Sequence, residues 1–462
     1  MSPVAKTPVT WRAVLLGFIV LLTTGAYFSV STIGPRGQAA AGIVCFLSLA
    51  AACSQNLRAV NWKTIGWGVA LQFLFAVLVL YVKEVRSVFE IVGEGIKTLI
   101  SSSDKGAEFV FGSLAKFDGP AGFVFAFKAL PPIIFVSSFF SVLYYLGVLQ
   151  LLVRGFAVVM RYMMGTSGAE TLSVAANVFM GQTEAPLIVK PFIPKMTKSE
   201  LLALMGSGMA HISGGMMAVY ISYGADPVSI LCTCVMACPC SLYLTKLLLP
   251  ETETPETLGG AKIHVDKQYS NVIDAAAGGV KDGLFLALNV AAMLIGFLAF
   301  IALFDAMIGG IKPLLLKMNV PAEMLANWPD NLNLQTIFGW VFSPVAFLLG
   351  VDPAESNKVG SLLGIKLAAN EHVAYLQLKE WKATPGYLSP RSQLLSVYAL
   401  SGFANFASIG IQLGGIGAMA EGRKADLAKL GMRALFIGFL TTLINAAVAG
   451  LLMGDAAIPV KN

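Results

Sequence analysis

Nine apolar runs, each long enough to cross the hydrocarbon core of a lipid bilayer, dominate this sequence of 462 residues. They lie at roughly 13–34, 37–57, 64–82, 129–153, 201–225, 227–245, 283–304, 392–420 and 434–454. The runs are nearly continuous, which indicates helices rather than the alternating strands of an outer-membrane barrel. Only 13% of the residues are charged, against about a quarter in a soluble domain. We therefore expect an all-α integral membrane protein with nine transmembrane helices, in the inner or plasma membrane of the cell.

The first run, 13–34, could instead be a secretory signal, because Lys6 and Arg12 precede it. It is longer than the usual signal core of about 7–15 residues, and no clear cleavage site follows it. A retained membrane helix is the favoured interpretation.

Basic residues gather before the first run and in three short loops on the same side of the membrane. These positions are Lys6, Arg12 and the loops 55–63, 154–161 and 421–433. The short loops opposite, at 35–36 and 226, carry Arg36 alone. Cytoplasmic loops are enriched in Lys and Arg, so we predict a cytoplasmic N-terminus and a C-terminus outside.

Four cysteines lie close together around Pro239. They are Cys232, Cys234, Cys238 and Cys240. Thiolates suit soft metals, so a channel or metal permease using this Cys-Pro-Cys segment is one alternative. The other is that small apolar cysteines pack a helix, which we favour because the sequence has no nucleotide-binding motif of a metal pump.

The order of landmarks repeats in the two halves of the chain. The first half has GTSGAE (165–170), then Glu184, then SGMAHI (207–212); the second has GVDPAE (350–355), then Glu371, then SGFANF (401–406). The two series begin on opposite sides of the predicted membrane. Inverted repeats of this kind are typical of secondary transporters that work by alternating access.

The segments around the second glutamates are too short to cross and are interrupted by polar residues. The interruptions are Gln182-Thr183-Glu184 and Asn370-Glu371-His372. A segment that enters the bilayer, turns at a polar tip and leaves on the same side is a re-entrant hairpin, and it must line a protein or water-filled cavity. We predict two such helical hairpins.

The candidate site combines the hairpin tips with polar residues in the run 392–420. Glu184 and Glu371 stand out, because ionisable residues at membrane depth are costly and usually functional. Asn405 and Ser408 lie three residues apart, so they would share one face of a helix. A purely structural role is the alternative for each of these residues. The glutamates could hydrogen-bond to helix ends, and Asn405 and Ser408 could form hydrogen bonds between helices. With Gln182, Thr183 and Phe403 the set contains no Lys or Arg, so it suits a small polar neutral solute carrying a ring.

Several long motifs resemble the concentrative nucleoside transporter family, in the same order. They are LPPIIFVSSFFSVLYYLGV, NVFMGQTEAPLIVKPFIPKMTKSEL, GIKLAANEHVAY and ALSGFANFASIGIQLGG, within roughly residues 38–454. The resemblance implies a homotrimer in the bilayer, with a scaffold domain and a mobile transport domain in each protomer. It also implies nucleoside uptake driven by an ion gradient, with no nucleic-acid polymer as partner and no cofactor besides the coupling ion.

The resemblance assigns roles to the site residues. Gln182, Thr183 and Glu184 would bind the nucleobase, with Phe403 beside it. The ribose hydroxyls would be held by Glu371 and by the broken helix after it, at Asn405 and Ser408.

The resemblance also implies a Na⁺ site built from Asn177, the Met180 carbonyl, and the positions of His211 and Ile212. His211 departs from the Ser or Thr of the family, and an imidazole could instead carry a proton. Alternatively, the His211 ring turns away to a neighbour and backbone oxygens still hold Na⁺. Na⁺ coupling is favoured over H⁺ coupling. His372, where the family usually has Phe, is a second departure that could alter the polarity of the site.

The sequence divides into five parts on this basis. They are an extra N-terminal helix (1–36), scaffold helices with an interfacial segment (37–153), the first repeat (154–249), a cytoplasmic connection with a scaffold helix (250–310) and the second repeat (311–454). A membrane enzyme using Glu184 and Glu371 as acid and base is disfavoured, because an inverted repeat does not predict a reactive geometry.

Overall fold

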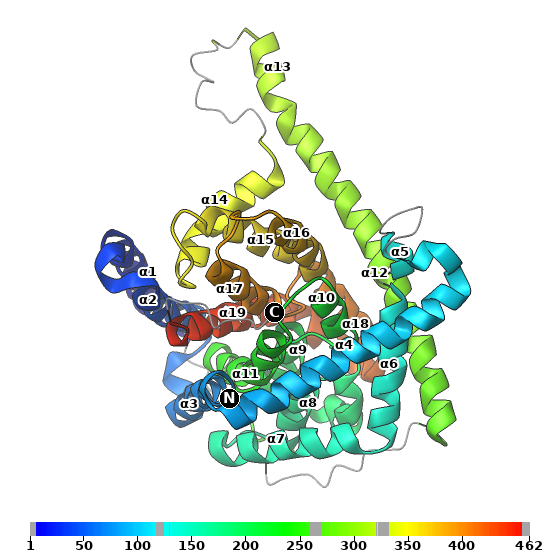
Figure 1. The fold of residues 1–462 in the computed structure, drawn as a ribbon. Coiled ribbons are helices and arrows are strands. Elements are labelled where there is room, and N and C mark those ends of the chain that lie inside the picture. Colours follow the sequence, from blue (N-terminus) through cyan, green and yellow to red (C-terminus); the bar gives the residue numbers. More distant parts are fainter. Residues whose placement is uncertain are drawn as a thin grey trace.

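The computed structural model describes residues 6–116, 124–128, 130–258, 269–319, 321 and 332–454. Every regular element in these residues is a helix (Figure 1). Four of the five predicted parts include residues outside the described ones: 1–5 of the N-terminal part, 117–123 and 129 of the scaffold part, 259–268 of the cytoplasmic connection, and 320 and 322–331 of the second repeat.

Eight helical segments of the described residues are long and apolar enough to cross a membrane. They are Val9–Phe28, Val30–Ala52, Trp62–Tyr81, Phe125–Tyr145, Lys198–Ser222, Pro227–Leu248, Val272–Lys317 and Glu421–Leu452. Each overlaps one of the nine predicted runs. The ninth run, 392–420, forms two shorter helices, α17 (Pro390–Leu400) and α18 (Phe406–Met419), separated by residues 401–405.

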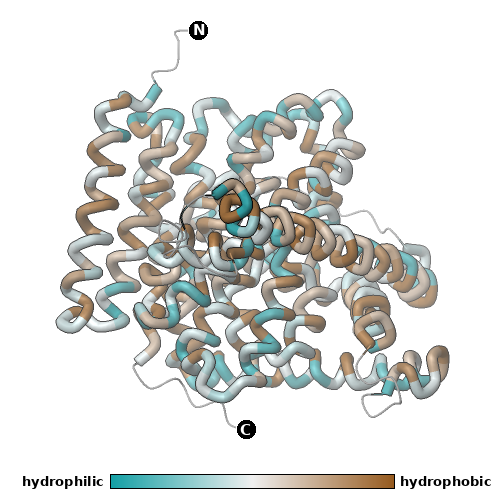
Figure 2. The backbone as a smooth tube through the Cα atoms, turned by 90° about the horizontal axis from the view of Figure 1, so that it is seen from above, coloured by the Kyte–Doolittle hydropathy of each residue, from teal (hydrophilic) through white to brown (hydrophobic). Residues whose placement is uncertain are grey.

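The N-terminal third of the chain forms the outer part of the molecule. Its elements are α1 (Val9–Phe28), α2 (Val30–Ala52), η1 (Leu57–Ala59), α3 (Trp62–Tyr81), α4 (Lys83–Phe111), η2 (Gly112–Ala115), α5 (Phe125–Lys128), α6 (Leu130–Tyr145) and α7 (Val148–Met164). Helix α1 packs on α2 at the edge of the molecule and buries Ala26 alone (Figure 1). In Figure 2 this pair is hydrophobic along most of its length.

Two connections differ from the sequence prediction. The loop expected at 35–36 is a kink inside α2, where Gly34 takes a φ of 61° that suits glycine and Pro35 follows. The basic residues expected in a loop at 154–161 lie within α7.

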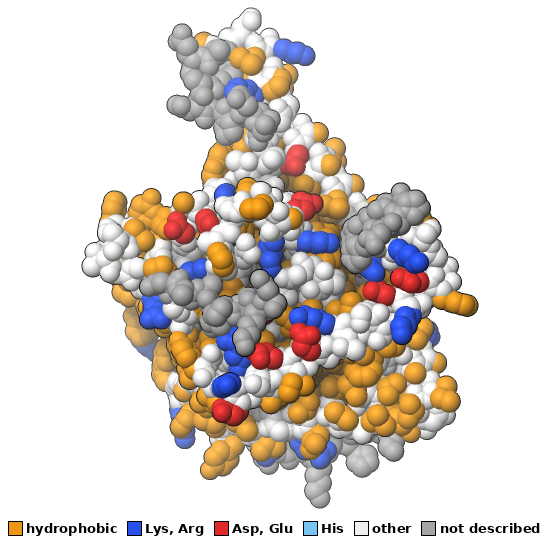
Figure 3. Space-filling view, in the orientation of Figure 1, with side chains coloured by type: hydrophobic (Ala, Val, Ile, Leu, Met, Phe, Trp, Pro, Cys, Tyr) orange, Lys and Arg blue, Asp and Glu red, His pale blue; other side chains and the backbone are white. Residues whose placement is uncertain are grey.

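Helix α4 is amphipathic. Its buried residues, Gly93, Ile96, Ser103 and Ala107, recur along one face. In Figure 3 charged side chains follow the diagonal course of α4, and hydrophobic side chains cover the surface below it. This pattern suits a helix lying at the surface of a membrane.

The segment predicted as the first repeat contains α8 to α11. Its elements are α8 (Gly168–Ala176), η3 (Ala185–Lys195), α9 (Lys198–Ala210), α10 (Gly214–Ser222) and α11 (Pro227–Leu248). The arms α8 and η3 pack against each other and are joined by residues 177–184. Glu170 and Glu200 complete capping boxes at the starts of α8 and α9, as helix-start carboxylates do.

The segment predicted as the second repeat follows the long helix α12 (Val272–Gly309). Its elements are α13 (Ile311–Lys317), α14 (Leu334–Phe347), α15 (Ser356–Ala368), α16 (Glu371–Ala383), α17, α18, η5 (Glu421–Arg423) and α19 (Lys424–Leu452). The arms α15 and α16 pack together and are joined by Ala369 and Asn370.

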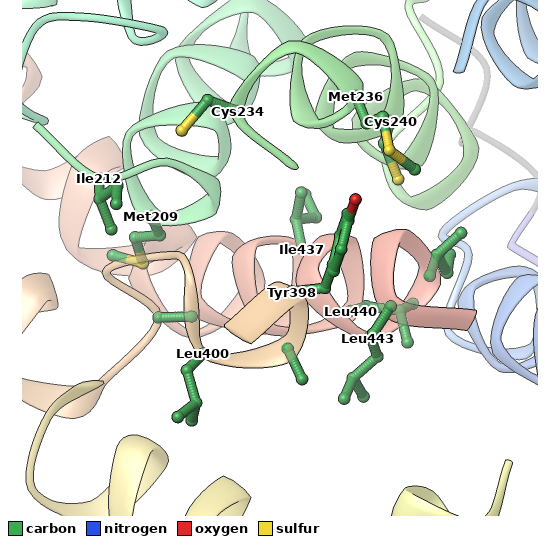
Figure 4. Packing of buried hydrophobic residues seen from close by; sticks show 14 of the residues in the cluster. Met209, Ile212, Cys234, Met236, Cys240, Tyr398, Leu400, Ile437, Leu440 and Leu443 are labelled. Carbon is green, nitrogen blue, oxygen red and sulfur yellow. The ribbon is translucent and has the colours of Figure 1, made fainter. Parts of the chain in front are cut away.

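The core lies where α9, α11, α17 and α19 meet. Figure 4 shows Met209, Cys234, Tyr398 and Ile437 converging there from these four helices. A Cβ on Gly438 of α19 would lie 2.6 Å from the Cβ of Met209, so this glycine lets the two helices approach closely. The core therefore joins parts of both halves of the chain.

Candidate functional site

A cavity of ≈ 600 Å³ lies between the hairpin tips, the break before α18 and one face of α12. All seven residues predicted to bind substrate line it. They are Gln182, Thr183, Glu184, Glu371, Phe403, Asn405 and Ser408. The structure thus brings together side chains that are up to 226 positions apart in the chain.

The first tip is closed by Glu184. One oxygen of its carboxylate accepts a hydrogen bond of 3.0 Å from the backbone N–H of Gly181, and its own N–H donates to the Gly181 carbonyl at 3.0 Å. The Glu184 side chain is exposed where it faces the cavity. The tip therefore presents a carboxylate that retains acceptor capacity for a ligand.

The second tip begins α16. The Asn370 side chain caps this helix by accepting from the Val373 N–H at 2.9 Å. Glu371 follows as the first residue of the helix, where the helix dipole favours negative charge. Its two carboxylate oxygens accept hydrogen bonds from the Tyr220 hydroxyl at 2.9 Å and the Asn405 Nδ2 at 3.0 Å.

Asn405 and Ser408 were expected to share one face of a helix, and that expectation is wrong, whereas the broken helix that the resemblance implies there is present. Asn405 precedes α18, and its Oδ1 accepts the Ser408 N–H at 2.9 Å as an N-cap. The same break brings the Phe403 N–H to the His211 carbonyl at 3.1 Å, at the gap between α9 and α10. The two interrupted helices therefore meet at their breaks.

A chain of amides fixes the orientation of Gln182. Its Nε2 donates to the Ser408 hydroxyl at 3.2 Å, and its Oε1 accepts from Nε2 of Gln412 at 3.2 Å. Gln412 is fully buried and also donates to the Met205 carbonyl at 2.9 Å. Sequence reasoning missed Gln412, although it lies four residues after Ser408 and so on the same side of α18.

Sequence reasoning also missed the wall that α12 contributes. Asp282, Leu286, Asn289 and Met293 line the cavity from this helix. Their spacing of three and four residues is the available signal, since it places two polar residues on one stripe of an apolar helix.

His372 lines the cavity within an aromatic cluster. Its Nε2 is 3.1 Å from the Tyr223 hydroxyl, and its ring contacts Phe125, Tyr220 and Tyr223. The imidazole thus occupies an aromatic setting that suits the Phe expected from the family.

The residues proposed for a cation come from two places next to the cavity: Asn177 and Met180 from the turn after α8, and His211 and Ile212 from the gap between α9 and α10. Asn177 and His211 both hydrogen-bond to Ser207, and Ile212 follows His211 in the chain. Met180 lines a smaller cavity of ≈ 100 Å³ that shares Glu184 with the main one. The Phe179 carbonyl accepts the Gly214 N–H at 3.0 Å, which joins this turn to the gap after α9.

The four cysteines around Pro239 are buried within α11. Cys232 contacts Met236, and Cys238 lies 3.5 Å from Nε2 of His211. In the part of the chain that the structure describes, no three His, Cys, Asp or Glu side chains group as metal ligands. The positions of the four cysteines therefore suit packing of α11 against its neighbours.

Chemically, the cavity offers hydrogen-bond acceptors, amides and an aromatic ring. Among the described residues that line it there is no Lys or Arg. Such a lining suits a neutral solute with several hydroxyl or N–H groups, because carboxylates accept those hydrogen bonds and amides both donate and accept.

Three family models match this chain. Residues 41–114 and 229–450 match the models described as the N-terminus and C-terminus of Na⁺ dependent nucleoside transporters, and residues 126–227 match a model described as nucleoside recognition. The chain belongs to the Na⁺ dependent nucleoside transporter family. The family indicated by the sequence motifs is thus confirmed.

Relatives in this family come from bacteria and mammals. An uncharacterized transporter of Haemophilus influenzae is 39% identical over 90% of this chain and 97% of its own length. The sodium/nucleoside cotransporter 1 of Mus musculus is 40% identical over 89% of this chain, which spans 63% of that longer protein.

Solved structures of the CNTnw transporter are similar in fold. Its inward-facing, substrate-bound state is 38% identical, with a TM-score of 0.81 over 90% of this chain and 97% of that one. A variant in an outward-facing state is 37% identical, with a TM-score of 0.83 over 90% of this chain and 98% of that one.

Proposed function

We propose that this protein is a secondary active symporter that takes up nucleosides across the cell membrane together with Na⁺. The observation that carries the proposal is the cavity itself, where three carboxylates, several amides and two phenylalanine rings converge, with no Lys or Arg among the described residues that line it. Relatives named as sodium/nucleoside cotransporters and a similar structure described as substrate-bound support it. Similar structures in inward- and outward-facing states support alternating access.

The roles proposed for the side chains follow from their hydrogen-bonding capacity. Gln182, Thr183 and Glu184 would bind the nucleobase, because an amide, a hydroxyl and a carboxylate can read both donors and acceptors on its edge. Phe403 would lie against the base, since an aromatic face stacks on any nucleobase.

The ribose would bind at the second tip. Glu371 would accept hydrogen bonds from its hydroxyls, and Asn405 and Ser408 would lie beside them. Glu371 is already held by Tyr220 and Asn405, so it is oriented before a ligand arrives. A site built to pair with hydroxyls discriminates strongly against analogues that lack them.

The residues present fit Na⁺ as the coupling ion. Oδ1 of Asn177 is buried and has no hydrogen-bond partner among the described residues, so it can serve as a hard oxygen ligand. Backbone oxygens of Met180 and Ile212 would complete the set. When bound, Na⁺ supplies the electrochemical driving force for uptake.

His211 itself does not suit a ligand role. Its Nδ1 lies 2.8 Å from the Ser207 carbonyl and its Nε2 faces the Cys238 sulfur, so both ring nitrogens are engaged. This arrangement favours Na⁺ over H⁺ as the coupling ion, with the His211 ring turned away.

We propose that the protein consists of the five parts expected from the sequence. The two hairpins would be re-entrant, and the two repeats would have opposite orientations in the membrane. The N-terminus would be cytoplasmic and the C-terminus outside. Helix α12 would belong to the scaffold and contact lipid or other protomers of a homotrimer, because large hydrophobic residues such as Leu284, Leu288 and Ile295 are exposed along it.

Uptake of radiolabelled uridine into proteoliposomes tests the proposal. Accumulation should follow an imposed Na⁺ gradient and should fail with a proton gradient alone. Glu184→Gln and Glu371→Gln should each abolish uptake while the protein stays folded, and Glu253→Gln, an exposed carboxylate, should behave as the parent. Absence of accumulation under both gradients would reject nucleoside uptake, and normal uptake by both cavity variants would place the site elsewhere.

A further inference from the structure

The amide of Asn177 is held in one orientation. Its Nδ2 donates to the Ser173 carbonyl at 3.1 Å and to the Ser207 hydroxyl at 2.9 Å. A flipped amide would set Oδ1 against the Ser173 carbonyl, which is an acceptor only. Both amide hydrogens are therefore used, and Oδ1 is left without a donor among the described residues, fully buried.

The Ser207 hydroxyl is oriented to accept that hydrogen bond. Its own proton is donated to the Leu204 carbonyl at 3.2 Å, one turn back in α9. Its lone pairs are thus directed toward Asn177, and the residue lies at 0% exposure in the packed end of α9.

His211 secures the same turn of α9. The helix ends at Ala210, and the imidazole Nδ1–H donates to the Ser207 carbonyl at 2.8 Å, where a continuing helix would supply a backbone N–H. Because Nδ1 is the donor, Nε2 is the acceptor and faces the thiol of Cys238 at 3.5 Å. The imidazole thus satisfies the carbonyl of the residue that orients Asn177.

We propose that Ser207 is a positioning residue of the cation site, holding the Asn177 amide so that its Oδ1 faces the ion, with His211 securing Ser207. The inference rests on the proposed Na⁺ coupling. This role of Ser207 explains how the protein, with His211 in place of a hydroxyl ligand, keeps Oδ1 of Asn177 in a fixed position for the ion. Groups that orient metal ligands without touching the metal commonly change metal affinity by about 10- to 100-fold when removed.

The test measures Na⁺ binding without transport. The unfolding temperature of the purified full-length protein is followed against NaCl concentration, with choline chloride holding ionic strength constant. Ser207→Ala should raise the Na⁺ concentration at half-maximal stabilisation about tenfold. Nucleoside affinity at saturating Na⁺ and the unfolding temperature without Na⁺ should stay near those of the parent.

Two further variants keep the outcome decisive. Ser207→Cys, nearly the same size but a poor acceptor, should shift the Na⁺ midpoint in the same direction, and it decides the result if Ser207→Ala does not fold. Ser396→Ala is the matched control, because this buried hydroxyl donates only to the Ser392 carbonyl of its own helix.

Asn177→Ala separates the two levels of the proposal. If it abolishes Na⁺-dependent stabilisation while both Ser207 variants keep the parent midpoint, the role of Ser207 is overturned and the cation site stands. If Asn177→Ala itself keeps the parent midpoint, the cation site is elsewhere and the inference falls with it. A lower unfolding temperature with an unmoved midpoint would show that Ser207 only packs, and would also overturn the inference.

Discussion

The hydroxyl of Tyr220 donates a hydrogen bond of 2.9 Å to Glu371, across 151 positions of the chain. The other carboxylate oxygen accepts from Asn405 at 3.0 Å, and all three side chains are buried. Residues from α10, α16 and the break before α18 therefore fix this carboxylate before a ligand binds. Such preorganisation saves the ordering cost that binding would otherwise carry.

Removing the Tyr220 hydroxyl should weaken nucleoside binding. In Tyr220→Phe, Glu371 retains one side-chain donor and is free to turn, so we expect affinity to fall about tenfold, or about 1.4 kcal/mol. Equilibrium binding at saturating Na⁺ measures this effect.

Tyr243→Phe is the control for that variant. Tyr243 is equally buried and donates to Gln72 at 2.8 Å, and it does not line the cavity. If both variants lose affinity alike, the loss reflects general destabilisation and not the orientation of Glu371.

Two adjacent glycines of α18 offer a second test of the first tip. A Cβ on Gly415 would lie 2.6 Å from Cγ2 of Thr183, whereas a Cβ on Gly414 would meet nothing within 4 Å. Gly415→Ala should displace Thr183 and lower nucleoside affinity several-fold, and Gly414→Ala should leave affinity unchanged. Both substitutions gain the same helix propensity, so their difference isolates the contact.

The ion pair between Lys246 and Glu170 should contribute strongly to stability. Their charged atoms are 2.7 Å apart, with side-chain exposures of 7% and 1%. Lys246→Met leaves the Glu170 charge buried without its ion-pair partner and should cost about 3–5 kcal/mol, whereas Glu170→Gln should cost less, because Lys246 keeps a second ion pair of 3.3 Å with Glu251. The double variant should cost less than the sum of the two, as measured by unfolding.

The pair between Lys195 and Glu256 serves as the comparison for that cycle. Its atoms are 3.0 Å apart, but exposures of 70% and 47% leave it in water. The same cycle there should give a coupling of about 0–1 kcal/mol. Equal couplings in the two pairs would contradict the role assigned to burial.

Lys366 should be needed for stability through its hydrogen bonds. Its buried ammonium donates at 2.8 Å to both the Ala399 carbonyl, near the end of α17, and the Thr442 hydroxyl of α19. Lys366→Met leaves two buried acceptors unpaired and should cost about 1–3 kcal/mol. Thermal unfolding checks this, with Lys63→Met, an exposed lysine, expected to match the parent.

Much of the architecture and the cavity lining was predictable from sequence. Glu184 and Glu371 were conspicuous because a charge at membrane depth is costly, and the polar residues beside them indicated the tips of short segments. Both residues line the cavity. A site residue could therefore be predicted from its local sequence where a charged side chain stands among apolar neighbours.

The breaks in the helices were harder to predict. Residues 401–405 interrupt the run 392–420 over only five positions, between apolar segments on both sides, so a pattern of apolar residues indicates one helix there. What stabilises the break is the hydrogen bond from Phe403 to His211, between residues far apart in the chain. Ser207 was missed for the same reason, since its partner Asn177 is 30 positions away.

The second arms of the two hairpins are built differently. Arm α16 is a regular α-helix, whereas η3 is a 3₁₀ helix containing Pro186, Pro191 and Pro194, each of which lacks a backbone donor. Matching order along the chain therefore does not bring matching stiffness. Amide hydrogens should therefore exchange with solvent deuterium sooner along 185–195 than along 371–383. The more compliant arm, η3, is the one that begins directly after the proposed nucleobase contacts at 182–184.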